Sequence, residues 1–318
     1  MQFIYKLNKD NSLTKLDQAD ENGSWIHLEN PSREDVEALA KRWKFNAEDI
    51  LSVLDDQETS RVLGIDEGPE TPLVTLVQFP MRTKNPMGNE QYDTYPLAIV
   101  LTNHVVITAS HYAPKFIHDY IENPLELGIE TTTKETFVLK LLWYLSRRYN
   151  EDLDSILGKS RMIENTLHVG VTSVQIFELM GYQQSMINFD SALRGNQPIY
   201  DALQASDDYF KSPEHDKLLG RITHETVQAN TTANVGRDVI SGYANLANAV
   251  ANNASLKPLE VLTVITLFSS IIGIPGSFFG MNSIPGTHWG WGVYCIWVIT
   301  LVTCGVAYYI LKHLGYFK

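Results

Sequence analysis

The chain is short of cysteine and of positive charge. Only two of its 318 residues are cysteines, Cys295 and Cys304, and both lie in one apolar run, which excludes a disulfide framework. Asp and Glu outnumber Lys and Arg by 37 to 25, and the net charge is -12. Phosphate binding depends on clustered Lys and Arg, so this charge balance argues against a nucleic-acid partner.

Two features that would indicate other protein classes are also missing. The first ten residues contain no apolar core as long as that of a secretory signal, so we expect the N-terminal part to remain in the cytosol. Gly158-Lys159-Ser160 resembles the end of a phosphate-binding loop, but Leu153 occupies the position of its first glycine. Without such a loop, and without a grouping of nucleophile, base and orienting residue, we expect no enzyme activity and no organic cofactor.

Charged residues are absent from two long runs near the C-terminus. Residues 261–279 and 291–311 contain no Asp, Glu, Lys or Arg, and each run is close to the roughly 20 residues that cross a bilayer. Lys312 and Lys318 follow the second run, whereas residues 283–290 contain no Lys or Arg. The positive-inside rule then places both termini in the cytoplasm. We therefore predict a multi-pass protein of the cell membrane, surrounded there by the lipid bilayer.

The rest of the chain divides into a mixed part and a helical part. Short β-branched runs predict strands at 3–7, 25–28, 62–65, 73–79, 95–102 and 105–109. Sequences that open helices begin at Pro31 and Asn46, and the polar residues 83–94 are expected to form a surface loop. Strand signals nearly vanish after Lys134, and long helices are expected at 134–168, 175–194 and 213–279.

These patterns predict an α+β membrane protein. An N-terminal α/β cytosolic domain precedes a very long stalk helix, which continues into the first of two C-terminal transmembrane helices. The predicted parts are the α/β domain 1–132, the helical region with the stalk 133–260, the first transmembrane helix 261–282, an extracellular loop 283–290, the second transmembrane helix 291–311 and a cytosolic tail 312–318.

The first apolar run carries a polar stripe. Small or polar residues recur at intervals of three or four, which holds them on one face of a helix, at Thr263, Thr266, Ser270, Gly273, Ser277 and Gly280. This face is either a seam where small residues let helices approach or the lining of a pore with hydroxyl groups facing water. Two spans cannot enclose a pore, so the second interpretation requires several subunits.

A tripeptide at the end of this run favours the pore. Gly280-Met281-Asn282 closes the first span, and with the soluble domain, the long helix and the two C-terminal spans it resembles the CorA family of divalent-cation transporters, whose signature is Gly-Met-Asn. The resemblance extends along the chain to Glu48-Asp49 and Arg61, to the stalk segment 237–242, to Val261-Leu262-Thr263, and to residues 289–292.

The resemblance implies a funnel-shaped homopentamer that transports divalent cations passively, driven by the membrane potential, with Mg²⁺ as the expected ion. Gly280, Met281 and Asn282 would form the selectivity filter. Five Asn282 amide oxygens could accept hydrogen bonds from the waters of hydrated Mg²⁺, an ion that loses its first shell reluctantly. The pore-lining residues would be Asn245, Leu262, Thr263, Thr266, Ser270, Gly273 and Ser277.

The chain departs from the family pattern at its expected regulatory site. Family members that sense cytosolic Mg²⁺ pair an N-domain Asp, here Asp49, with a stalk Asp of the adjacent subunit, but Arg221 occupies the second position. A guanidinium cannot bind a cation. Asp49 and Arg221 would instead form a salt bridge that holds the funnel closed without metal, or Glu225, one helical turn on, would supply the missing carboxylate for Mg²⁺.

The sequence leaves two questions open: whether any histidine binds a metal, and which of several functions the chain has. His104, His111 and His118 are seven residues apart but straddle a strand, a turn and a helix, so we do not expect them to converge on a metal. Five copies of His288 beside the filter could favour Zn²⁺, Co²⁺ or Ni²⁺. A zinc transporter of the related branch is therefore one alternative to Mg²⁺ uptake, and a membrane-tethered cytosolic sensor or scaffold is another.

Overall fold

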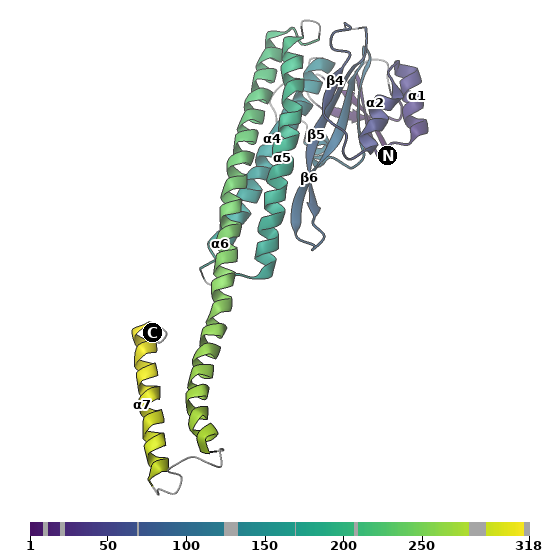
Figure 1. Cartoon of the computed structure of the whole chain (residues 1–318). Helices are drawn as coiled ribbons and strands as arrows, with labels where there is room; N and C mark the ends of the chain where they lie inside the picture. Colours follow the sequence, from purple (N-terminus) through teal and green to yellow (C-terminus); the bar gives the residue numbers. More distant parts are fainter. Residues whose placement is uncertain are drawn as a thin grey trace. The chain divides into compact units, whose positions relative to one another are not determined.

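A computed structural model describes residues 1–8, 12–19, 23–68, 70–123, 133–168, 170–206, 209–279 and 291–314 (Figure 1). The chain divides into two compact units. The first comprises Met1–Leu167 and Val171–Ala247, and the second comprises His168–Gly170 and Asn248–Lys318. The long helix α6 (Pro213–Phe279) contributes residues to both, and α7 (Gly292–His313) belongs to the second. The predicted long helix 213–279 is thus confirmed.

The first unit is built on one seven-stranded sheet with the strand order β2-β1-β3-β7-β6-β5-β4. Only β3 and β7 pair in parallel, and all other neighbours are antiparallel. The strands are β1 (Gln2–Leu7), β2 (Leu13–Lys15), β3 (Ser24–Glu29), β4 (Arg61–Leu63), β5 (Leu73–Lys84), β6 (Glu90–Leu101) and β7 (Val105–Ser110).

Both faces of this sheet are covered by helices. Successive side chains of a strand point to opposite faces, so one strand contributes to the core on each side. On β3, Ile26 and Leu28 pack with Val36 on one side, where α1 (Arg33–Trp43), α2 (Ala47–Leu51) and the 3-10 turn η1 (Ser52–Leu54) lie. Trp25 faces the opposite side, which is covered by α3 (Lys115–Glu122), α4 (Lys134–Glu164) and α5 (Ser173–Ala205).

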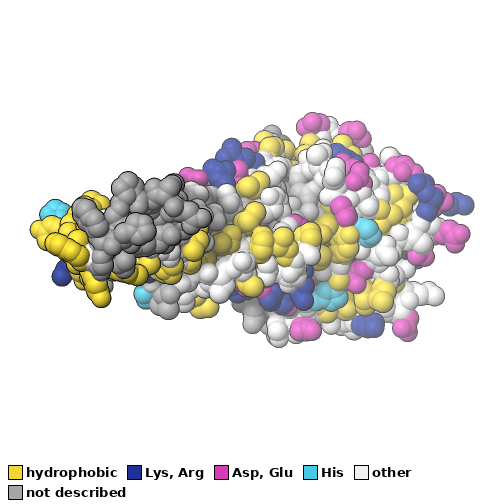
Figure 2. Space-filling model, turned by 60° about the horizontal axis from the view of Figure 1, so that its bottom comes forward, with side chains coloured by type: hydrophobic (Ala, Val, Ile, Leu, Met, Phe, Trp, Pro, Cys, Tyr) yellow, Lys and Arg dark blue, Asp and Glu magenta, His cyan; other side chains and the backbone are white. Residues whose placement is uncertain are grey.

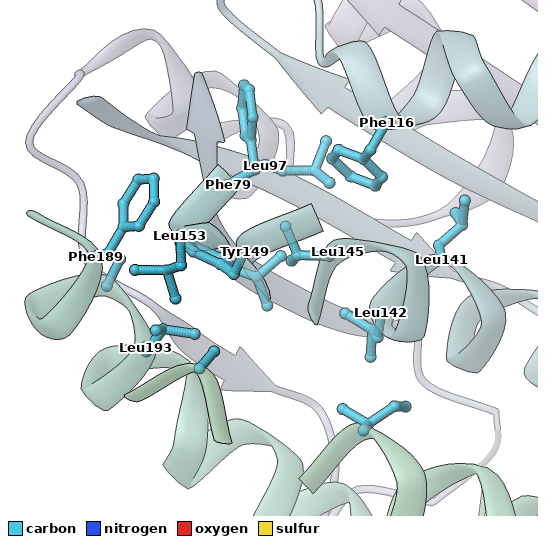
Figure 3. Packing of buried hydrophobic residues seen from close by; sticks show 14 of the residues in the cluster. Phe79, Leu97, Phe116, Leu141, Leu142, Leu145, Tyr149, Leu153, Phe189 and Leu193 are labelled. Atoms are coloured by element: carbon cyan, nitrogen blue, oxygen red, sulfur yellow. The ribbon is translucent and has the colours of Figure 1, made fainter. Parts of the chain in front are cut away.

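The larger core lies between the sheet and the long helices (Figure 3). Leu145, Tyr149 and Leu153 of α4 are fully buried between the sheet and α5, and Phe79 of β5 and Phe189 of α5 belong to the same cluster. Burying each such side chain stabilises the fold by roughly 1.5–3 kcal/mol relative to leaving it exposed. The part of α6 in this unit joins the core through buried small and aliphatic residues, among them Leu218, Ile222, Ala229, Ala233 and Ile240.

The prediction of a surface loop at 83–94 is wrong. Strands β5 and β6 extend through most of this segment, with Lys84 opposite Glu90. The connection is a tight turn in which the side-chain oxygen of Asn85 accepts hydrogen bonds from the backbone N–H groups of Met87 and Asn89. The polar sequence is compatible with a strand because α5 supplies hydrogen-bonding partners: the Tyr92 N–H donates to Ser185 Oγ at 2.8 Å.

Helix boundaries also differ from the predicted ones. Helix α5 continues eleven residues past the predicted end at 194, because it passes through Pro198 to Ala205. Its start is fixed by a capping box: the Gln175 N–H donates to the Thr172 side chain, and the Thr172 N–H donates to the Gln175 side chain. The short strand β2 was not predicted, and α3 was expected only as a helix that contains His118, without bounds.

Candidate functional site

The second unit exposes apolar side chains that a soluble chain would bury. Among the described residues one helix is long and apolar enough to cross a membrane, the segment Pro213–Ile274 of α6, and none of its most apolar window is buried. A shorter apolar stretch, Trp297–His313, lies in α7. In the space-filling view α7 presents mostly hydrophobic side chains, whereas charged side chains are spread over the sheet-containing unit (Figure 2). Length and composition therefore support one span, and the second span 291–311 stays a prediction.

The polar stripe is exposed on α6. The hydroxyls of Thr263, Thr266, Ser270 and Ser277 each donate to the carbonyl four residues earlier, at 2.7, 2.7, 2.8 and 3.1 Å. Their protons are therefore used within the helix, while the oxygen lone pairs remain free to accept. Waters around a hydrated cation present hydrogen atoms, so such a row of acceptors suits them.

The other predicted pore residues lie on α6 or just beyond its described end. Leu262 and Asn245 are exposed, and a Cβ atom added at Gly273 would meet nothing within 4 Å. The predicted filter Gly280-Met281-Asn282 and His288 lie outside the described residues. The structure thus describes the helix that leads to the predicted filter, and the filter residues stay a prediction.

Asp49 lies in the short helix α2, which is capped by Asn46. Partial burial raises the pKa of its carboxyl above the ordinary value, and the nearby Arg61 opposes this rise. Arg61 in turn pairs with Glu58. Partial burial disfavours the charged form of this carboxylate, and a cation bound beside it would stabilise that charged form.

Arg221 and Glu225 lie together on α6 in unit one. They line an open groove of about 450 Å³ with Trp143, Lys217, Gly220 and His224. Glu225 accepts a hydrogen bond from Asn150 Nδ2 at 2.9 Å, so its carboxylate is already oriented from α4. Among the ion pairs formed within the described part of one chain, Arg221 and Asp49 do not pair, and their predicted contact is one between adjacent subunits. It stays a prediction, as does the role of Glu225.

The three regularly spaced histidines have different neighbours. His104 lies against the Trp43 ring, His111 bonds Asp56, and His118 contacts Glu29. They do not converge, as expected. His118 instead joins two residues that sequence analysis did not single out, His27 and Glu29, and one ligand atom from each of the three lies within 4.8 Å of the others. The His-x-Glu spacing on a strand was the available signal, because it puts both side chains on one face.

The protonation states of this group follow from its burial. His27 is completely buried, which lowers the pKa of its imidazole. The hydrogen bond from His27, assisted by that from His118, lowers the pKa of Glu29 to about 2 against the opposing effect of burial. At neutral pH the group therefore contains an ionised carboxylate beside a neutral, buried imidazole.

Comparison with known proteins finds one family over nearly the whole chain. The model of the family described as "CorA-like Mg2+ transporter protein" matches residues 20–313. A curated relative is the cobalt/magnesium transport protein CorA of Methanocaldococcus jannaschii. It is 20% identical over an alignment of 326 positions, gaps included, and the alignment covers 98% of this chain and 99% of that protein.

Solved structures share the fold. The complete structure of the CorA magnesium transporter of M. jannaschii matches with a TM-score of 0.79 at 18% identity, covering 100% of this chain and 99% of that one. Full-length CmaX matches at 0.71 and 18% identity, covering 98% and 97%. The cytoplasmic domain of ZntB from Vibrio parahaemolyticus matches at 0.60 and 12% identity, covering 78% of this chain and 96% of that domain.

Proposed function

Because the chain belongs to the CorA-like Mg²⁺ transporter family, whose members are ion transporters and not enzymes, we propose that it carries Mg²⁺ passively across the cell membrane through a homopentameric pore. The observation that carries this proposal is the stripe of hydroxyl oxygens on the otherwise apolar and exposed last part of α6, residues 261–279. In the family context the stripe of each subunit faces the pore axis and the apolar remainder faces lipid or neighbouring helices.

The proposed membrane arrangement has two spans, 261–282 and 291–311, with both termini in the cytoplasm. Lys312 and His313 in the last turn of α7 support this orientation. Residues 283–290 then form the outer loop, and the sheet-containing unit lies in the cytosol with the first part of α6 as its stalk.

Selection would take place at Gly280-Met281-Asn282. A ring of five Asn282 amides presents oxygens that accept hydrogen bonds from the water shell of Mg²⁺, which keeps its waters more firmly than other common cations. The hydroxyl oxygens of Thr266, Ser270 and Ser277 would provide acceptors of the same kind along the path. Their side chains need not replace any water of the ion.

The membrane potential is the proposed driving force. It contributes roughly 2.3 kcal/mol per elementary charge per 100 mV, and therefore about twice that for a divalent cation. This is enough for uptake against a substantial concentration ratio without ATP.

Regulation would act between subunits at the groove on the stalk. Asp49 of one subunit would meet either Arg221 of its neighbour, in a bridge that closes the pore without metal, or Glu225, in a site that closes it when Mg²⁺ binds. The two versions predict different behaviour of a variant that lacks Arg221: more conduction than wild type at low Mg²⁺ in the first, and unchanged inhibition by Mg²⁺ in the second.

A zinc transporter is the second candidate, supported by the fold likeness to the ZntB cytoplasmic domain. Liposomes that contain a Mg²⁺-sensitive or a Zn²⁺-sensitive dye separate the two functions. Wild type, Asn282→Ala and the control Asn103→Ala, which removes an exposed amide from the β6–β7 turn, would be compared under an inside-negative potential.

We expect Mg²⁺ influx in wild type and Asn103→Ala, and influx that is lost or made unselective in Asn282→Ala. Influx of Zn²⁺ without Mg²⁺ would move the protein to the zinc branch. Absence of both fluxes from correctly assembled protein would favour a membrane-tethered sensor.

A further inference from the structure

We propose that His27, Glu29 and His118 form a binding site for Zn²⁺ in the sheet-containing unit, separate from the transport path. Nothing in the proposed pore uses these residues. The proposal concerns a bound ion that links the sheet to a surface helix, and it stands whether or not the pore selects Mg²⁺.

The fold brings the three ligands together from two distant segments. His27 and Glu29 are two residues apart on β3, so both point to the face that α3 and α4 cover. His118 lies on α3, and its Nε2 is 2.5 Å from Glu29 Oε1. The His27 Nε2 atom is 3.3 Å from the same oxygen. Two imidazole nitrogens and one carboxylate oxygen thus lie within 4.8 Å of one another.

The spacing fits a small tetrahedral ion after a local adjustment, in which the two imidazole nitrogens, now within 4.8 Å of each other, approach by up to about 1.5 Å. Ligand atoms about 2.0–2.1 Å from Zn²⁺ in a tetrahedron are about 3.3 Å apart. The His27–Glu29 distance already has this value, and His118 must withdraw by less than about 1 Å. The His118 side chain is 40% exposed and its ring makes edge-on contacts with Phe3 and His27, so its movement affects few neighbours.

A second layer of contacts orients the buried imidazole. His27 Nδ1 is 2.8 Å from Thr108 Oγ1, which also accepts a hydrogen bond from Trp25 Nε1 at 2.9 Å. In the metal-free protein the neutral ring carries its proton on Nε2, which donates to Glu29, and Nδ1 accepts from the Thr108 hydroxyl. Metal binding requires the other tautomer, in which Nδ1–H donates to a second lone pair of Thr108 Oγ1 and the lone pair of Nε2 is left for the metal. The Phe3 ring stacks on His27, with centroids 6.2 Å apart, and holds its plane. Such outer contacts are typical of metal-binding histidines.

The burial of the group leaves one side open. His27 is completely buried and Glu29 is 13% exposed, whereas His118 borders solvent. An ion can therefore approach past His118, and a water can complete four-fold coordination. Three protein ligands of the His₂Glu type with an open fourth position are a known zinc arrangement.

The ligand set also excludes Mg²⁺ as the natural occupant. Mg²⁺ prefers six oxygen ligands in octahedral geometry, and this group offers one carboxylate and two nitrogens. Imidazole favours Zn²⁺ and its neighbours in the first transition row. Co²⁺, which takes the same geometry and absorbs visible light, is therefore the suitable probe.

The test is a Co²⁺ titration of metal-free, full-length protein in detergent, without a polyhistidine tag and with excess Mg²⁺ to occupy the pore. Wild type is compared with His118→Gln and Glu29→Gln. The matched control is His111→Gln, because His111 is another partly exposed histidine whose Nδ1 lies 3.0 Å from a carboxylate, that of Asp56, with no second imidazole beside it.

We expect one Co²⁺ per chain with the strong visible absorption of four-coordinate cobalt, displaced by Zn²⁺ and not by Mg²⁺. Each ligand substitution should lower the affinity by at least 10–100-fold, about the loss seen when outer contacts alone are removed, while His111→Gln should bind as wild type does. Unchanged affinity in both ligand variants, or absence of the absorption in wild type, would overturn the proposal. Circular dichroism of the metal-free variants verifies that each is folded, so the comparison rests on folded protein.

Discussion

The side-chain amide of Asn196 on α5 bonds both backbone groups of Gln78 on β5. The Gln78 N–H donates to Asn196 Oδ1 and Asn196 Nδ2 donates to the Gln78 carbonyl, each at 2.9 Å. Strand β4 pairs with β5 no further than Leu76, so the amide takes the place of the missing strand. Tyr149 OH donates to the same carbonyl from α4 at 3.0 Å, which ties both helices to this position of the sheet.

Replacing Asn196 by Leu should destabilise the first unit. The substitution leaves the partly buried Gln78 N–H and Ser60 hydroxyl without their acceptor, and an unsatisfied group costs about 1–3 kcal/mol when it is buried. We expect a loss of about 2–5 kcal/mol, measured by denaturant unfolding of purified protein. The control Gln197→Leu, on the same helix and half-exposed, should stay within about 0.5 kcal/mol of wild type. Equal stability of the two variants would show that the clamp contributes nothing.

Two helical glycines should respond oppositely to alanine. A Cβ at Gly181 would lie 2.9 Å from the backbone oxygen of Glu90, where α5 meets β6, so Gly181→Ala should cost about 1–3 kcal/mol through overpacking. A Cβ at Gly158 meets nothing within 4 Å, and Gly158→Ala should stabilise α4 by roughly 0.5–1 kcal/mol. Thermal unfolding of the two variants tests this, and a stabilising Gly181→Ala would contradict the close approach.

Asp152 should make stability fall between about pH 4 and pH 6. Burial raises the pKa of its carboxyl to about 6 despite the guanidinium of Arg148 at 2.8 Å, with Glu151 adding to the rise and Lys115 opposing it. The folded protein therefore holds this proton more tightly than the unfolded chain does, and the stability from it is present below about pH 4 and lost as the pH rises through 6.

At roughly 1.4 kcal/mol for each tenfold change in proton affinity, the loss is about 3 kcal/mol. Asp152→Asn should remove it, because the amide stays neutral, so the variant should gain stability relative to wild type as the pH is raised from 4 to 7. Denaturant unfolding at several pH values measures the difference. A difference that does not change with pH would contradict the raised pKa.

Arg221→Ala should distinguish the two versions of regulation. If Arg221 bridges to Asp49 of the neighbour, each exposed pair contributes about 0.5–1 kcal/mol, and five pairs shift the closed state by about 2.5–5 kcal/mol. The variant should then conduct more at low Mg²⁺ than wild type. Lys217→Ala, in the same groove one turn earlier, is the control. Unchanged currents with unchanged Mg²⁺ inhibition would exclude the bridge.

Much of the architecture could be predicted because it is encoded in local patterns. The β-branched runs gave most of the strands of the sheet, and the absence of strong terminators after Pro213 predicted the full extent of α6. The segment 83–94 was misread because its polar residues are satisfied by side chains of α5, about 100 residues away, and sequence spacing does not show such partners. Helix α5 continues past Pro198 because packing of Ile199, Tyr200 and Leu203 outweighs the lost hydrogen bond.

The candidate sites also divide into features that local sequence patterns encode and features that depend on contacts between distant residues. The spacing of Thr263, Thr266 and Ser270 was sufficient to predict one polar helix face, which the structure exposes. The His27–Glu29–His118 group could not be predicted, because His118 is 89 residues from Glu29 and α3 is held against the sheet by core packing, in which Phe116 and Ile117 are buried. Tertiary contact creates this group, and only its His-x-Glu half is visible in the sequence.

The central claim, passive transport of divalent cations, is tested most directly by Mg²⁺ influx into liposomes at a series of imposed membrane potentials, with no ATP and no proton gradient. The account predicts influx that rises as the inside is made more negative, and that stops when the potential is collapsed. Influx independent of potential, or none without a proton gradient or ATP, would contradict it.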